Sequence, residues 1–120
     1  MARRIITRRM LTSVLVDTTA ILKTDKMENM VLLVDYIRTG SSTGTITVYG
    51  AMDANANVKY AIGIAPTLTG SRDADGAIAY TTSTTVLYEI PGVHPYIYID
   101  WNEGVDGASI TVDLIGTETY

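Results

Sequence analysis

The chain alternates short apolar segments with turn-forming residues, and no segment has the spacing of an amphipathic helix. Alternation is strict over residues 45–50, where Ile46 and Val48 share one face and the threonines share the other. Residues 84–90 and 95–101 repeat this two-residue period. Segments of this kind, bounded by Gly, Pro, Asn or Asp, predict β-strands.

Residues 30–38 depart from this alternation because they are apolar almost throughout. Periodicity alone does not separate such a run from a buried helix segment. Its β-branched and aromatic residues, and the Gly-Ser-Ser-Thr-Gly loop at 40–44, favour a central strand. The other expected strands lie at residues 11–16, 19–23, 58–64 and 109–115, and the other expected turns and irregular segments at 25–29, 53–57, 66–83 and 102–107.

Seven or eight short strands without a helix predict an all-β fold, a single antiparallel β-sandwich. A jelly roll and an immunoglobulin-like sandwich both fit this strand count. Composition agrees, since 120 residues that are 47% hydrophobic are enough for one domain with a real core. Eighteen threonines and a charged fraction of only 18% give the surface a neutral, β-favouring character.

Charge divides the chain into two parts. Four of its nine basic residues lie in the first nine positions, whereas all 13 acidic residues come later. Residues 1–9 therefore carry +4 from side chains and the remainder carries −8. The sequence predicts a basic N-terminal arm, residues 1–10, followed by a sandwich domain, residues 11–120. The arm does not match a secretory signal peptide, because its apolar part is short and interrupted.

Three interpretations of the arm are open: docking onto an acidic protein surface, a solvated tail, or binding of nucleic acid. The acidic domain would repel the phosphates that the arm attracts, which disfavours nucleic acid. We therefore expect protein docking, in which arginines supply charge and isoleucines supply apolar anchors. The expected partner-binding residues of the arm are Arg3, Arg4, Ile5, Ile6, Arg8 and Arg9.

No residue pattern supports catalysis or a bound cofactor, so we expect a non-enzymatic protein without cofactor or metal. The chain has no cysteine, and its one histidine, His94, has no serine and acid at the spacing of a triad. The D-x-D-G sequence at 73–76 lacks the later ligands of a calcium loop and predicts a turn. No segment approaches the length of a membrane span.

Tyr96 and Tyr98 share one face of the strand expected at 95–101, and Ile97, Ile99 and Trp101 share the other. The apolar set is expected in the core, which leaves the tyrosines outside as a contact surface for a protein or a sugar. A carbohydrate-binding or adhesion module is therefore the alternative function.

Two segments carry a resemblance to a known class of proteins: GTITVYGAMD at residues 44–53 and YEIPGVHPYIYIDW at residues 88–101. Their style and spacing, within residues 30–116, resemble small β-sandwich virion proteins of tailed bacteriophages. Tyr98 stands where arginine is common in those proteins, which removes a surface charge. Residues 1–10 have no part in the resemblance.

The resemblance implies a structural role in the virion, as a capsid decoration (cement) protein or as a small neck or tail component. The expected partners are the major capsid protein or other virion proteins, and further copies of the chain in a homo-oligomer such as a trimer. Neither nucleic acid nor a membrane is an expected partner.

Overall fold

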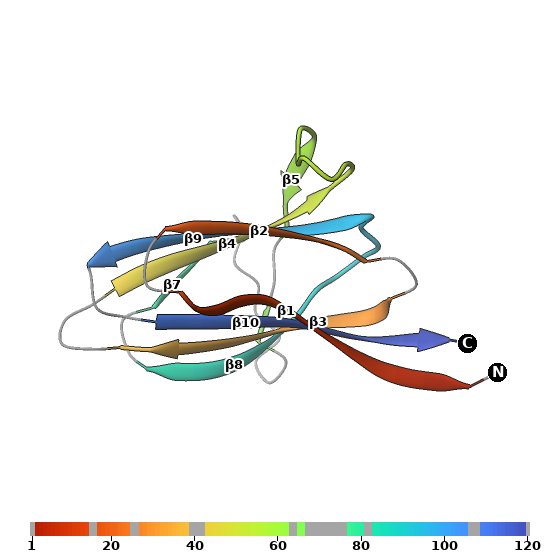
Figure 1. Cartoon of the computed structure of the whole chain (residues 1–120), viewed down its shortest axis with the longest axis horizontal. Coiled ribbons are helices and arrows are strands. Elements are labelled where there is room, and N and C mark those ends of the chain that lie inside the picture. The colour runs from red at the N-terminus through yellow and green to blue at the C-terminus, as the bar shows by residue number, and fades with distance from the viewer. Residues whose placement is uncertain are drawn as a thin grey trace.

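The computed structural model describes residues 2–14, 17–24, 27–38, 43–62, 65–66, 77–80, 83–105 and 109–119. In these residues it contains ten β-strands in two sheets and no helix (Figure 1). The β3 sheet has the order β1 (Arg3–Val14), β10 (Ser109–Thr119), β3 (Glu28–Ile37), β8 (Thr84–Glu89), β6 (Ala65–Pro66). The β4 sheet has the order β2 (Thr18–Lys23), β9 (Tyr96–Val105), β4 (Thr43–Ala51), β5 (Lys59–Ala61), and β7 (Ala77–Tyr80) also pairs with β4.

The strand pairing is nested, and every pairing between the described strands is antiparallel. The first strand pairs with the last, β1 with β10, and β2 pairs with β9, the strand before the last. Continuing inward, β3 pairs with β8 and β4 with β7. A chain folded into one long hairpin and wrapped over two sheets gives this pattern, which is the jelly roll. The predicted all-β sandwich is thus confirmed, and of its two predicted topologies the structure has the jelly roll.

The core lies between the two sheets and follows the predicted alternation. Strand β3 turns Leu32, Val34 and Tyr36 inward, and all three are fully buried. From the opposite sheet, the ring of Trp101 meets that of Tyr36 with 5.7 Å between centroids. The indole also lies across Gly44, where a Cβ atom would collide with the ring. The remaining fully buried large side chains are Ile46, Val48, Ile97, Ile99, Ile110, Val112 and Leu114.

Strand β1 runs without interruption from Arg3 to Val14, through residue 10, where the sequence predicted the end of a basic arm. The segment is extended, but it is the edge strand of the β3 sheet. Backbone pairing with β10 holds it from Arg3, opposite Thr119, to Arg9, opposite Asp113. Ile6 and Met10 also pack against the core, so apolar burial adds to the pairing.

Other elements also differ from the sequence-based expectation. Strand β9 continues to Val105 through a segment expected as a turn, because pairing with β4 overrides the turn preference of Asn102. Strand β10 likewise extends beyond the expected end at Ile115. Strand β6 includes Pro66 and lies at the edge of the β3 sheet, where proline is tolerated, and β7 forms within the segment that was expected to be irregular. The described residues contain no helix with the length and apolarity to cross a membrane.

Candidate functional site

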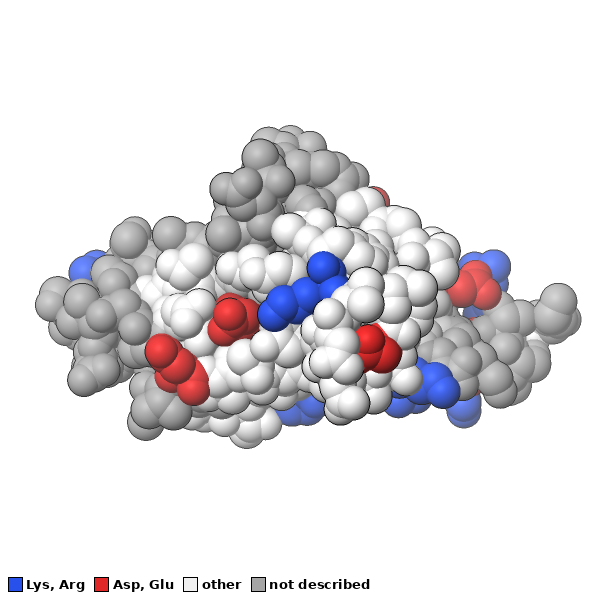
Figure 2. All heavy atoms as spheres, turned by 90° about the horizontal axis from the view of Figure 1, so that it is seen from above, with Lys and Arg blue, Asp and Glu red and all other residues white. Residues whose placement is uncertain are grey.

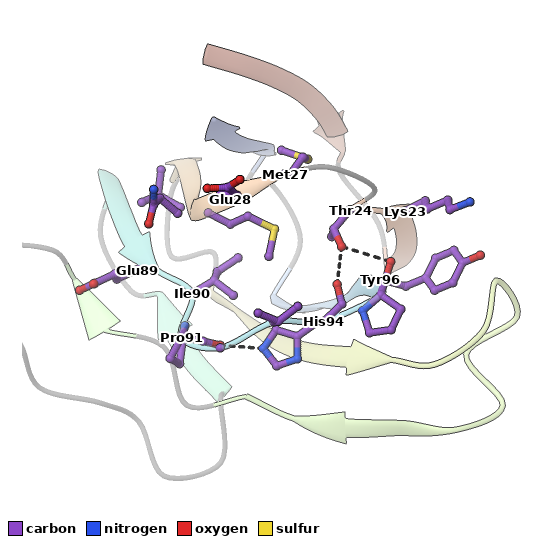
Figure 3. Close-up of a pocket in the computed structure, with 15 residues that line it drawn as sticks. Lys23, Thr24, Met27, Glu28, Glu89, Ile90, Pro91, His94 and Tyr96 are labelled. Carbon is purple, nitrogen blue, oxygen red and sulfur yellow. Dashed lines mark hydrogen bonds between the residues drawn. The ribbon is translucent and has the colours of Figure 1, made fainter. Parts of the chain in front are cut away.

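A groove opens at one end of the sandwich, between the two sheets (Figure 3). We call it the end groove; it has a volume of about 1010 Å³ and is lined by residues 23–24, 27–31 and 89–96. Met27, Met30 and Ile90 contribute buried apolar surface. Lys23, Glu28 and Glu89 add charge to its lining. An apolar groove with a charged border is suited to receive side chains of another molecule.

One wall of the end groove is the connection between β8 and β9, which Thr24 fixes in place. The Thr24 hydroxyl lies within hydrogen-bond reach of the backbone carbonyls of His94 and Pro95 (Figure 3). The Thr24 N–H also donates to the carbonyl of Pro95, at 3.1 Å. Gly92 lies in the left-handed region, with φ of 81°, a conformation that glycine adopts without strain. These contacts hold the wall without a regular strand.

His94 is buried in this wall, and both of its ring nitrogens have partners. Nε2 lies 2.7 Å from the carbonyl oxygen of Pro91, which can only accept, so Nε2 carries the hydrogen. In the neutral ring, Nδ1 then accepts from the Tyr60 hydroxyl at 2.8 Å. The two rings pack tightly against the backbone of Gly50, where an added Cβ would collide with both. His94 therefore ties the wall to β5 through the Tyr60 hydroxyl.

The acidic residues in the described part of the chain are distributed over both sheets. Glu89 and Asp100 belong to different sheets, in β8 and β9. Among described residues, no group of three or more His, Asp or Glu side chains could hold a metal ion. The predicted turn at 73–76 lies outside the described residues.

The arginines of β1 lie along the edge of the β3 sheet, and three of them pair with carboxylates of the same chain. Arg4 binds Glu118 through two nitrogens, at 2.9 and 2.7 Å. Arg9 forms an ion pair with Asp113, which raises the pKa of Arg9, first through the hydrogen bond and then through charge. Arg3 lies 3.6 Å from a carboxylate oxygen of Glu28.

The other three expected partner-binding residues of β1 differ in exposure. Arg8 is exposed, and no described carboxylate pairs with it. Ile5 is 75% exposed, whereas Ile6 is partly buried against the core. Ile6 is thus committed to the fold, while Arg8 and Ile5 remain available to a partner.

Tyr96 and Tyr98 lie on the outer face of the β4 sheet, as predicted, with Ile97, Ile99 and Trp101 in the core. Tyr98 contacts two other side chains on this face. Its ring meets Tyr49 edge to face at 5.7 Å, and the Lys59 ammonium lies 4.6 Å from the Tyr98 centroid and 4.9 Å from that of Tyr49. We call Tyr49, Tyr98 and Lys59 the tyrosine–lysine cluster. Figure 2 looks onto this face, where few charged residues interrupt the uncharged surface.

Sequence reasoning missed Tyr49, Lys59 and Tyr60. Strict alternation over 45–50 already placed Tyr49 on the face opposite Ile46 and Val48, so its side of the sheet was available from the pattern. Lys59 and Tyr60 reach their partners because β5 folds back on β4, with Tyr49 opposite Ala61. The sequence of neither strand alone indicates which residues of β4 and β5 lie opposite one another.

The fold and these surfaces define a jelly-roll domain with a basic edge strand and an apolar end groove. No protein-family model matches the sequence, and no curated protein matches it. Among solved structures, the chain is similar to the SPBc2 prophage-derived protein YomS, at 10% identity and a TM-score of 0.70. That similarity covers 98% of this chain and 96% of the other, and it shows a shared fold.

A structure described as Bacillus endospore appendages that form a novel family of disulfide-linked pili is also similar, at 16% identity and a TM-score of 0.41. It covers 99% of this chain and 91% of the other.

Proposed function

We propose that the protein is a non-enzymatic structural protein of a tailed-phage particle, a capsid decoration protein that binds the outer shell and stabilises it. The shared fold with a prophage-derived protein, over nearly the full length of both chains, supports a phage origin. The jelly roll is also a common architecture of viral capsid proteins. The proposed partners are the major capsid protein or other virion proteins, and the proposed location is the virion.

The observation that carries the proposal is the free edge of β1. This strand is 12 residues long, and it stands at the end of the β3 sheet, where no described strand pairs with its outer side. A long free edge is a template for another strand, and proteins usually block it. Retaining such an edge is consistent with strand addition by a partner.

The arginines determine which partner the edge accepts. Two copies of β1 paired antiparallel about Ile6 would set Arg3 against Arg9 and Arg4 against Arg8, and like charges directly opposite are destabilising. Self-pairing of the edge is thereby disfavoured. An extended acidic segment of a shell protein would instead gain charge pairing with Arg8 along with main-chain hydrogen bonds.

Carbohydrate binding by Tyr96 and Tyr98 is less well supported. A sugar stacks on an open aromatic face, but the Lys59 ammonium lies over the ring of Tyr98 and over that of Tyr49. The cation already occupies the electron-rich face that a sugar would use.

The test is binding of the purified protein to phage particles that lack it, measured by co-sedimentation over a range of concentrations. Arg8→Glu should weaken binding about tenfold, and more at low salt, because it reverses a charge on the edge. Lys59→Glu is the matched control, since it makes the same charge change on an exposed residue of β5, in the other sheet and outside the end groove. Equal binding by Arg8→Glu and the unmodified protein would contradict docking through β1. Saturation at a few copies per particle would place the protein in the neck or tail.

A further inference from the structure

The free edge of β1 is regular over only part of the strand. From Arg3 to Arg9, β1 stays in unbroken antiparallel register with β10. The register then shifts twice before Val14, and Ser13 has a positive φ of 45°. A strand that is bulged in this way bends and no longer offers an evenly spaced row of backbone groups on its outer side. An added strand can therefore pair continuously only with residues 3–9.

The two faces of this regular edge place different side chains beside an added strand. Successive side chains of a strand point to opposite faces. Ile6 packs against the core, so Arg8, two residues further along, lies on the same, inner face. Ile5, which is 75% exposed, and Thr7, which is also exposed, lie on the outer face. Each face thus offers one apolar and one polar or charged neighbour to the incoming strand.

Arg8 is the arginine of this edge whose charge no described carboxylate balances. Arg3, Arg4 and Arg9 each form an ion pair with a carboxylate of the same chain, whereas Arg8 is exposed without such a pair. A carboxylate on the incoming strand gains most opposite Arg8. An acidic residue opposite Arg4 or Arg9 would also meet the carboxylate already paired there, and repulsion between the two reduces its gain. The edge therefore favours one acidic residue at one position.

We propose that the β1 edge accepts an antiparallel strand of another protein, with its acidic residue opposite Arg8 and apolar residues opposite Ile6 and Ile5. The inference rests on the proposed function, which supplies a shell protein as the source of that strand. Antiparallel pairs are slightly more stable per residue than parallel ones, and side chains directly opposite each other stabilise the pair when they are apolar or of unlike charge. Because the two strands run in opposite directions, the partner reads acidic, any residue, apolar, apolar from its N-terminal end.

The experiment measures binding of capped peptides to the isotope-labelled full chain by NMR titration. The peptide TETVVTT has the proposed order and spans residues 3–9 of β1. We expect its shift changes to concentrate in the amides of residues 3–9. The peptide TKTVVTT, with lysine in place of glutamate, should bind about fivefold more weakly. The reversed peptide TTVVTET, which fits a parallel strand, should also bind more weakly than TETVVTT.

A charge exchange locates the carboxylate on the edge. Arg8→Glu should invert the preference, so that TKTVVTT binds about fivefold more tightly than TETVVTT. Lys59→Glu is the matched control, because it makes the same charge change on β5 in the other sheet, and it should keep the preference of the natural protein. Circular dichroism verifies that both variants are folded.

Several results would overturn the inference. Equal binding of the three peptides, or shift changes outside residues 3–9, contradicts an edge that selects this strand. A preference that Arg8→Glu leaves as it is, or that Lys59→Glu also inverts, contradicts the position of the carboxylate.

The peptide titration and the particle assay separate this inference from the proposed function. Binding to particles without any preference among the peptides overturns the strand specificity and leaves the proposed function in place. The expected preference, together with no binding to particles, overturns the proposed function and supports the specificity of the edge.

Discussion

At the scale of single residues, several polar side chains stabilise turns and connections by hydrogen bonding to backbone groups. Asp53 at the tip of the β4–β5 hairpin accepts hydrogen bonds from the N–H groups of Asn55 at 2.9 Å, Asn57 at 3.0 Å and Val58 at 3.3 Å. Thr24 and His94 do the same for the wall of the end groove. Their hydrogen bonds satisfy backbone groups that have no partner in a sheet, at places where the chain turns sharply.

The Asp53 turn makes the hairpin sensitive to acid. Backbone hydrogen bonds, above all that from Asn57, hold the pKa of Asp53 below its ordinary value. A carboxylate with a lowered pKa stabilises the folded state above its unfolded pKa, and that contribution disappears as the pH falls through the folded pKa. We therefore predict that the stability difference between the natural protein and Asp53→Asn is full at neutral pH and shrinks below about pH 4. Urea unfolding of both proteins from pH 2 to pH 7 measures it, and parallel profiles would refute it.

At the scale of elements, the strand that was hardest to interpret from sequence is β1. Its arginines suggested a separate charged arm, yet they are placed by pairing with β10. Carboxylates that lie more than 100 residues later in the chain complete the arrangement, including Asp113 and Glu118. Ion pairs between segments so far apart leave no signal in the local sequence.

We predict that removal of residues 2–10 destabilises the domain by about 2–4 kcal/mol. The deletion takes away the packing of Ile6 and Met10 against the core and exposes the edge of β10. Urea denaturation compares the truncated and full chains. Arg8→Gln, which keeps the strand, is the control and should stay within about 0.5 kcal/mol of the natural protein. An unchanged unfolding midpoint after truncation would show that β1 is an independent arm.

The strands predicted most accurately from sequence are those in which apolar and polar residues alternate along the strand itself. The expected ranges around Ile46 and Val48 in β4, and around Ile97 and Ile99 in β9, have the predicted faces. What could not be predicted is the register of distant segments, such as Tyr60 next to His94 or Lys59 over Tyr98. The candidate partner-binding residues were located on the surface by pattern, with Ile6 as the exception, because burial against the core depends on a neighbouring strand.

At the scale of the whole molecule, the nested topology pairs the ends of the chain. The first strand joins the last, and the central pair β4 and β7 is the most local of the nested series. Contacts between distant segments must overcome a large loss of chain entropy before they stabilise anything. The jelly roll is therefore held together by its least local pairings.

This topology predicts slow folding, in milliseconds to seconds. Trp101 is the one tryptophan of the chain and is fully buried, so its fluorescence reports formation of the core. Stopped-flow dilution from urea measures the rate. Refolding within microseconds would contradict the importance of the long-range pairings.

The pairing of Arg3 with Thr119 also fixes where the chain enters and leaves the domain. Figure 1 shows both ends together at one end of the sandwich, away from the β4–β5 hairpin. A peptide or fluorescent protein fused to either terminus would therefore emerge at the same place. Displayed on a particle, fusions at the two termini would occupy overlapping space, whereas an insertion in the β4–β5 hairpin would give a second, separate point of display.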